Sequence, residues 1–282
     1  MLVEGYSEMK KFLPAIEMKG EPTIFDEALG SAQERLVRLI IGDAMETQLE
    51  ERDPSDHRLL LHCQRAICQD AFLECIPDLD LILTDAGFAV VNNEKVTMAS
   101  RDRVDALKKG TDAKLQASRD TLIAYLLRTS AYNSWRLTEE FEVFASALVT
   151  TYEEFRKVAI YTNAAAKSYP QSWNEFHALL PAMNTALMTD VASYISREYA
   201  IELIGKLRER TQMSPAEKAV FLIIQRAAAS YAMEDRAVGQ QLATRAYSLM
   251  LKDPDSFPTF AASEEAKDLS LKHSDTPIYS MF

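Results

Sequence analysis

The chain has 282 residues, about twice the usual length of one domain, and 48% of them are apolar. Gly and Pro number only 8 and 10, a composition that favours helices over the many tight turns of a β-barrel or β-sandwich. The net charge of -11 argues against a protein that coats nucleic acid, because phosphate binding requires a surface rich in Lys and Arg. Three cysteines give no disulfide framework, and neither a signal peptide nor a membrane span is evident. These features favour a mainly α protein of a reducing cytoplasm.

The first part of the chain carries two helical signals. Residues 25–51 show the i, i+3, i+4, i+7 spacing of apolar residues that is typical of one long amphipathic helix. Asp53 followed by Pro54 then indicates a new helix start, and that helix carries HRLLLHCQRAICQDAF at residues 57–72. Residues 1–78 are therefore predicted to form an N-terminal helical unit.

The apolar period then changes to two. Leu79, Leu81 and Leu83 alternate with other residues, and Asp85-Ala86-Gly87 is typical of a turn into a second short strand. We predict a small β-hairpin insertion over residues 79–99, with a possible third short piece near its end.

A long charged helix follows, and Ser100 is its expected N-cap. This helix and connecting helices are predicted over residues 100–163, and a second helical unit over residues 164–251. Residues 252–282 contain three prolines and few core periodicities, so we expect an extended C-terminal tail. The tail is either a loose terminus or an arm that orders against a neighbouring subunit. Its candidate interface residues are Pro277, Ile278, Tyr279, Met281 and Phe282.

Two segments of twenty residues align without gaps, DPSDHRLLLHCQRAICQDAF at 53–72 and SPAEKAVFLIIQRAAASYAM at 214–233. The identical pairs are Pro54/Pro215, Leu61/Leu222, Gln64/Gln225, Arg65/Arg226, Ala66/Ala227 and Ala71/Ala232. Further upstream, the alignment pairs Gly42 with Gly205. Duplication of one helical unit accounts for this order, and a chance match of helical patterns is the alternative.

The paired Gln-Arg is the most specific part of the repeat. We predict a structural role for Gln64, Arg65, Gln225 and Arg226. A guanidinium is a planar group with several donors, so each Arg is expected to reach carboxylates or helix-end carbonyls of the adjoining helix.

The segment 57–72 concentrates residue types that bind metals, but their spacing does not suit a metal site. His57 and His62 are five residues apart, as are Cys63 and Cys68, which places each pair about 140° apart around a helix. Ligands of one ion on a helix must lie three or four residues apart. We therefore interpret the cysteines as core residues and predict neither a metal nor a cofactor.

Enzyme signatures such as a glycine-rich phosphate loop, G-x-S-x-G, H-E-x-x-H or C-x-x-C do not occur in the sequence. No catalytic residue is predicted. Aromatic residues gather between Tyr132 and Phe176, where they are expected to pack in the core near the domain junction or to form a surface that binds a partner.

The strings DLDLILTDAGFAVVNNEKVTMAS, RDRVDALK and TTYEEFRKV resemble an uncharacterised family that is encoded in phages and prophages of gut anaerobes. The resemblance covers roughly residues 29–158. It implies a virion structural protein, similar to the head-tail connector or head-completion class. Members of that class form rings, commonly of twelve subunits, between the portal and the tail.

The expected function is therefore that of a phage head-tail connector or adaptor without enzymatic activity. The resemblance implies assembly in the host cytoplasm and a place in the virion, with portal and tail proteins as partners. DNA would at most pass through a channel, and the net acidic charge is compatible with a channel along which DNA slides without binding. The alternatives are a cytosolic α-helical adaptor that binds another protein, and an enzyme with an unfamiliar helical site.

Overall fold

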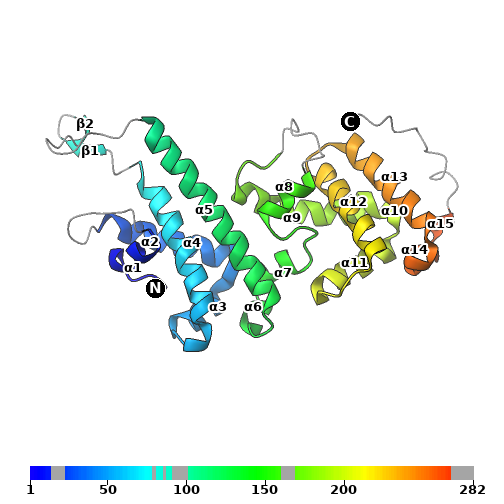
Figure 1. Cartoon of the computed structure of the whole chain (residues 1–282), viewed down its shortest axis with the longest axis horizontal. Coiled ribbons are helices and arrows are strands. Elements are labelled where there is room, and N and C mark those ends of the chain that lie inside the picture. The colour runs from blue at the N-terminus through cyan, green and yellow to red at the C-terminus, as the bar shows by residue number, and fades with distance from the viewer. Residues whose placement is uncertain (14–22, 78–80, 85–86, 91–100, 160–168, 268–282) are drawn as a thin grey trace. The chain divides into compact units, whose positions relative to one another are not determined.

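The computed structural model describes residues 1–13, 23–77, 81–84, 87–90, 101–159 and 169–267 (Figure 1). The protein is mainly helical, as predicted. It divides into two compact units, Met1–Glu142 and Val143–Phe282. Each unit has its own buried core.

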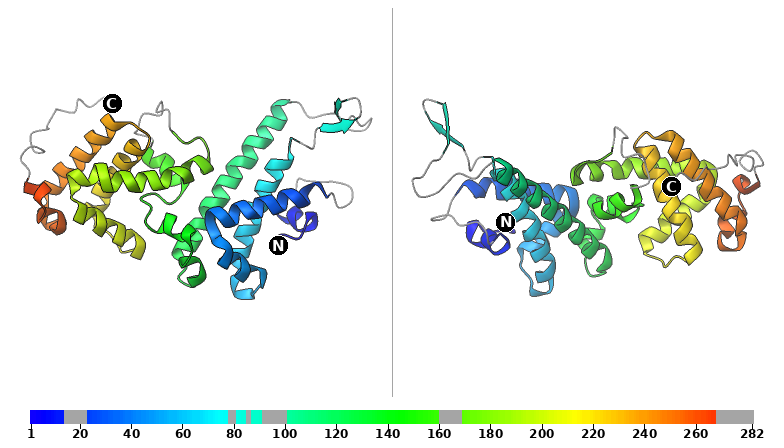
Figure 2. Two further views of the ribbon diagram at one scale, coloured as in Figure 1. Left: turned by 180° about the vertical axis from the view of Figure 1, so that it is seen from behind. Right: turned by 45° about the horizontal axis from the view of Figure 1, so that its top comes forward.

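The first unit is built around a long central helix, α4. Its helices are α1 (Tyr6–Phe12), α2 (Ile24–Leu36), the π-helical turn η1 (Val37–Ile41), α3 (Gly42–Glu50), the 3-10 turn η2 (Pro54–Asp56), α4 (His57–Cys75), α5 (Arg101–Arg128) and α6 (Asn133–Arg136). A further helix, α7 (Glu139–Ala145), crosses the division between the units. Helix α4 packs against α1, α2 and α5 (Figure 2).

The single long helix predicted over residues 25–51 is divided in the structure. The π-helical turn η1 interrupts it, and Gly42 follows with a φ of 71°. A π-helical turn inserts an extra residue into the ladder of hydrogen bonds, and a positive φ ends the regular helix. The periodic pattern continues through Ala44, but in the structure Ala44 is exposed and Met45 and Leu49 are buried instead, so the buried positions shift by one residue at the break.

The second unit repeats the arrangement around α12. Its elements are α8 (Tyr152–Ala159), α9 (Trp173–Ala186), the π-helical turn η4 (Leu187–Val191), α10 (Ala192–Ile195), α11 (Arg197–Glu209), α12 (Pro215–Ala232), α13 (Arg236–Lys252), the 3-10 turn η5 (Pro254–Ser256), α14 (Pro258–Ala261) and α15 (Glu264–Lys267). Helix α12 packs against α8, α9 and α13, as α4 does against α1, α2 and α5. Its start carries a complete capping box between Ser214 and Glu217.

Contacts outside the aligned segments support the predicted repeat. The rings of Tyr6 and Phe25 lie 5.8 Å apart in the first unit, and those of Tyr152 and Phe176 lie 5.7 Å apart in the second. Five buried positions of α5 also recur in α13 with the same spacing. They are Leu115, Arg119, Leu122, Ile123 and Leu126 in α5, and Gly239, Ala243, Ala246, Tyr247 and Met250 in α13. A chance match of one helical segment does not account for these further agreements.

The upstream alignment of Gly42 with Gly205 is wrong. Gly205 lies inside α11 with helical backbone, whereas Gly42 has φ 71° and ψ 161°. The residue with the same backbone conformation is Ser196, with φ 71° and ψ 150°. Gly42 follows η1 directly, and Ser196 follows η4 after the short helix α10. The backbone turn therefore recurs in both units although the residue type does not.

The boundary between the units lies at residues 142 and 143, about twenty residues before the predicted start of the second unit at residue 164. Helix α8 causes the difference, because it packs against α9 and α12 and so belongs to the second core. The Ala-rich segment that suggested the boundary lies mostly outside the described residues.

The predicted extended tail over residues 252–282 is wrong for its first half. Residues 254–267 form η5, α14 and α15, and Phe257 and Phe260 are completely or almost completely buried. Their rings contact Tyr199 and Tyr247, respectively. These aromatic anchors supply enough apolar burial to hold short helices that begin at prolines. The remaining tail residues, 268–282, lie outside the described part.

Two short strands lie within the predicted insertion. β1 (Leu81–Thr84) pairs antiparallel with β2 (Gly87–Val90), with Leu81 opposite Val90 and Thr84 opposite Gly87. Residues 78–80, 85–86 and 91–100 lie outside the described part. The turn, the third short piece and the full hairpin insertion over 79–99 therefore remain predictions.

Gly42 and Gly205 should respond in opposite directions to substitution by alanine. A Cβ at Gly42 would lie 2.6 Å from Glu140 Oε2 and 2.8 Å from Thr138 Cγ2, on a backbone with positive φ. We expect Gly42→Ala to lower the free energy of unfolding by about 1–3 kcal/mol. Gly205→Ala adds a Cβ to a helix interior with nothing within 4 Å, so it should stabilise by about 0.5–1 kcal/mol. Urea denaturation of both variants measures the two effects. If both substitutions stabilise or both destabilise the protein, this prediction is wrong.

Candidate functional site

The two glutamines of the repeat occupy equivalent buried positions. Gln64 and Gln225 are each only 4% exposed. The side-chain Nε2 of Gln64 donates to the carbonyl oxygen of Leu2 at 2.8 Å, and that of Gln225 donates to Leu148 at 2.7 Å. Each glutamine therefore ties the first segment of its unit to the central helix.

A carboxylate completes each glutamine site. Gln64 Nε2 also donates to Glu8 Oε1 at 3.0 Å, and Gln225 Nε2 to Glu154 Oε1 at 3.2 Å. The second oxygen of each carboxylate accepts a backbone N–H, from Glu4 and from Thr150. Buried amides need such complete bonding, so the two sites are matched structural clasps.

The first segments of the two units share a motif that the sequence analysis missed. The strings are LVEGYSE at residues 2–8 and LVTTYEE at residues 148–154, which agree in Leu, Val, Tyr and the final Glu. The offset is 146 residues here but 161 between the two glutamines, so a search without gaps finds only one of the two matches. A search for short motifs that allows gaps would have found it.

The two arginines of the repeat lie in different surroundings. Arg65 is exposed, and among the described residues it has no ion pair or hydrogen bond. It follows Gln64 directly and so points about 100° further around the helix, away from the core. Arg226 is partly buried. The glutamines thus make matched contacts in both units, whereas Arg65 does not contact a carboxylate or carbonyl within the described residues. The structural role of Arg226 remains a prediction.

A carboxylate is held by arginines elsewhere in the first unit. Asp70 Oδ2 accepts from Arg35 Nε and from Arg119 Nη2, each at 3.0 Å, and Arg35 also binds Glu74 at 2.5 Å. The Arg119 side chain is only 6% exposed. Burial lowers the pKa of Arg119, and the charge of Asp70 acts against that change. The network joins α2, α4 and α5.

The second unit fills the same place with apolar packing. Tyr231 aligns with Asp70, and Gly239 and Ala243 hold the positions of Leu115 and Arg119. A Cβ at Gly239 would lie only 2.8 Å from the Tyr231 ring, so the ring rests against the backbone there. The two units therefore share the same helix packing. The first unit holds this position with the ion pairs of Asp70, and the second unit holds it with the Tyr231 ring packed against Gly239.

The cysteines of the central helix are buried, in agreement with the prediction that they are core residues. Cys63 and Cys68 are both 0% exposed, and Cys75 is 3% exposed. Burial raises the pKa of the Cys63 thiol above its usual range, and raises that of Cys68 to about 12. These thiols therefore stay protonated at neutral pH, which makes them poor nucleophiles.

The two histidines of α4 lie apart from one another. His57 is exposed at the helix start, whereas the His62 ring packs 5.1 Å from the ring of Tyr125. Burial lowers the pKa of His62, and the positive charges of Arg65 and Arg58 lower it further. Among the described residues, no group of three His, Cys, Asp or Glu side chains is arranged to hold a metal ion.

The aromatic residues between Tyr132 and Phe176 mostly lie inside the two cores. Trp135 is 0% exposed and donates its Nε1 hydrogen to the carbonyl oxygen of Ile40 at 2.7 Å. In the second unit, Phe155 and Phe176 pack with ring centroids 5.4 Å apart, beside the buried Trp173. For these residues the core interpretation is confirmed.

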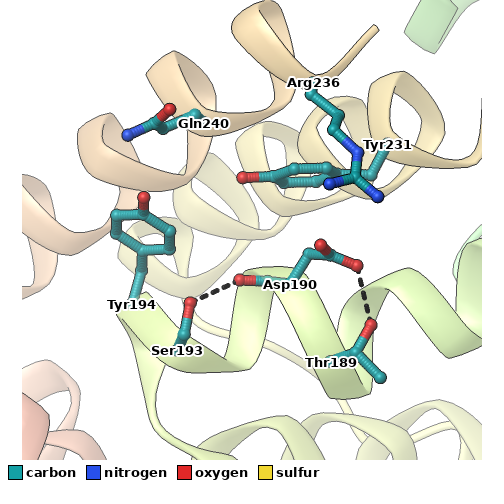
Figure 3. Close-up of a pocket in the computed structure, with 7 residues that line it drawn as sticks. All are labelled: Thr189, Asp190, Ser193, Tyr194, Tyr231, Arg236 and Gln240. Atoms are coloured by element: carbon teal, nitrogen blue, oxygen red, sulfur yellow. Dashed lines mark hydrogen bonds between the residues drawn. The ribbon is translucent and has the colours of Figure 1, made fainter. Parts of the chain in front are cut away.

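A polar cavity of about 330 Å³ lies in the second unit (Figure 3). One wall comes from η4 and α10, and the other from the end of α12 and the start of α13. The lining residues are Thr189, Asp190, Ser193, Tyr194, Tyr231, Arg236 and Gln240. Thr189 and Ser193 donate to the side chain and the backbone carbonyl of Asp190, at 2.7 and 2.6 Å.

The chemistry of this cavity suits the binding of polar groups more than proton transfer. Burial, helped by the charges of Tyr194 and Asp190, raises the pKa of Tyr231 to about 12. Its hydroxyl therefore remains protonated at neutral pH, far from the value that suits a general base. Arg236 and Gln240 are exposed at the opening and offer donors to a polar group.

The predicted interface residues Pro277, Ile278, Tyr279, Met281 and Phe282 lie outside the described residues. Within the described ranges, no helix is both long and apolar enough to cross a membrane.

Residues 23–145 match the model of a family of unknown function, DUF6712. No curated protein and no solved structure matches the chain. The matched region begins one residue before α2 and extends to the end of α7, so it covers most of the first unit. The match fits the resemblance to an uncharacterised family, and the family description carries no activity or partner.

Proposed function

We propose that this chain is a structural protein without enzymatic activity, which assembles as a ring and acts as a head-tail connector or adaptor in a phage particle. Portal and tail proteins would be its partners, and the virion its place. The resemblance of its strings to phage-encoded proteins motivates this class.

The matched glutamine clasps are the observation that carries the structural role. Gln64 and Gln225, together with Glu8 and Glu154, bind segments of their own unit, and Asp70 likewise joins three helices of its own unit. These polar side chains therefore stabilise the duplicated helical fold. Such a scaffold suits a protein that works through its surfaces.

Electron microscopy of negatively stained protein tests the proposal. The purified chain should form rings with a central channel, and in a mixture with the portal protein of the same phage it should co-migrate with the portal on size-exclusion chromatography. The same mixture with an unrelated portal protein serves as the control. A particle of monomer size that does not co-migrate with portal or tail proteins would contradict a connector.

A further inference from the structure

The outer face of α4 carries residues of the repeat that the fold of each unit does not use. Pro54/Pro215 lie at helix starts, Gln64/Gln225 form the clasps, and Ala66/Ala227 are buried. Leu61 and Leu222, however, are 37% and 39% exposed at equivalent positions. Both copies of the repeat therefore carry a leucine at an exposed position, where core packing does not require an apolar residue.

In the first unit this leucine lies between two arginines. Arg58, Leu61 and Arg65 follow the i, i+3, i+7 spacing of one helix face, and all three are exposed. Arg58 stacks over the Tyr125 ring at 5.1 Å. Neither arginine has an ion pair within the described part of the chain. The face therefore presents an apolar knob flanked by two positive charges.

Helix α2 presents a matching surface. Glu27 and Glu34 are exposed on the side opposite to the buried Phe25, Leu29 and Leu36, and neither has an ion pair among the described residues. Gly30 and Ser31 lie between the two acids. A Cβ added at Gly30 would meet nothing within 4 Å, so the surface there is open.

The two faces are complementary in charge and in the spacing of their charges. Seven residues separate Arg58 from Arg65 and also Glu27 from Glu34, which is about 10 Å along a helix. When Leu61 rests on the small residues between the two acids, each arginine reaches one glutamate whichever way the helices run. Opposite charges arranged in this way fix the register of a contact and exclude wrong partners.

We propose that the α4 face (Arg58, Leu61 and Arg65) docks on the α2 face (Glu27, Gly30, Ser31 and Glu34) of a second copy of this chain. The proposal rests on the ring assembly proposed above and names its contact. Both faces point away from the core of one unit, so the contact joins two different surfaces. Such head-to-tail contacts close into rings when the rotation between copies permits.

The second unit does not carry this pair of faces. Counted from the matched Phe25 and Phe176, the positions of Glu27 and Glu34 hold Ala178 and Thr185. Ala219 holds the position of Arg58. Leu222 lies between Lys218 and Arg226, but these two are eight residues apart rather than seven, and Arg226 is partly buried. Its flanking charges therefore do not match the spacing of Glu27 and Glu34, and Leu222 serves as the control for Leu61.

Sedimentation velocity of the full chain at several concentrations tests the contact. Leu61→Glu should raise the dissociation constant of self-association at least ~10-fold, whereas Leu222→Glu should leave it unchanged. The charge reversals Arg58→Glu with Arg65→Glu, and Glu27→Arg with Glu34→Arg, should each weaken assembly. Combining all four should restore it, which a merely unfolded variant would not do.

The outcomes separate this contact from the proposed function. If the unmodified chain assembles and Leu61→Glu assembles equally well, the contact is wrong and the ring proposal stands. Equal loss in the Leu61 and Leu222 variants would overturn a contact confined to the first unit, as would no rescue by the fourfold charge exchange. An unmodified chain that stays monomeric at every concentration would overturn the ring proposal and the contact with it.

Discussion

Replacing Asp70 by alanine is expected to lower the free energy of unfolding by about 3–5 kcal/mol, the cost typical of breaking a buried ion pair. The carboxylate bonds to Arg35 and Arg119, and the Arg119 side chain is only 6% exposed. Without Asp70 this buried guanidinium loses the carboxylate that compensates its charge most strongly. Urea denaturation followed by circular dichroism measures the loss.

A second substitution distinguishes the buried charge from simple loss of packing. Asp70→Leu combined with Arg119→Leu should cost no more than half as much as Asp70→Ala alone, because the buried ion pair is removed as a whole. The second unit already packs this place with Tyr231 against Gly239. Glu74→Gln, at a side chain that is 42% exposed, should cost less than about 1 kcal/mol. Strictly additive losses for Asp70 and Arg119 would contradict the coupling.

The two glutamine clasps should contribute similar amounts to the free energy of unfolding. Gln64→Met and Gln225→Met keep the side-chain volume but remove the donor to a backbone carbonyl and to Glu8 or Glu154. Each is expected to destabilise by about 2 kcal/mol, because a buried carbonyl and a carboxylate lose their partner.

An exposed glutamine gives the control for these two variants. Gln240 lies on the surface of α13, so Gln240→Met should change stability by less than about 0.5 kcal/mol. A large loss for one clasp and none for the other would show that the two sites are not equivalent. Differential scanning calorimetry provides a second, independent measurement.

The sequence predicted the helical class and the central helix of each unit because periodicity and caps are local signals. The helix expected after Asp53-Pro54 begins at His57 and ends at Cys75, and Ser214 caps its counterpart. The interruption at η1 was not predictable from the apolar pattern, because Ala44 continues that pattern although Met45 and Leu49 are the buried residues after the break.

Long-range contacts explain the remaining differences. The role of Gln64 depends on Leu2 and Glu8, which are 62 and 56 residues away, so the repeat marked the residue but not its partners. Composition suggested an extended tail, but Phe257 and Phe260 find Tyr199 and Tyr247 only in the folded unit. The exposed Arg65 was assigned an internal contact because the pattern does not show which way α4 faces.

The division into two copies of one folding unit is most directly tested by expressing Met1–Glu142 and Val143–Phe282 as separate polypeptides. Each fragment contains its own glutamine clasp and central helix. Circular dichroism during urea denaturation should show that both are helical and that each unfolds in one cooperative transition. A fragment that is unfolded by itself, or that folds only when the other is added, would contradict two self-contained copies.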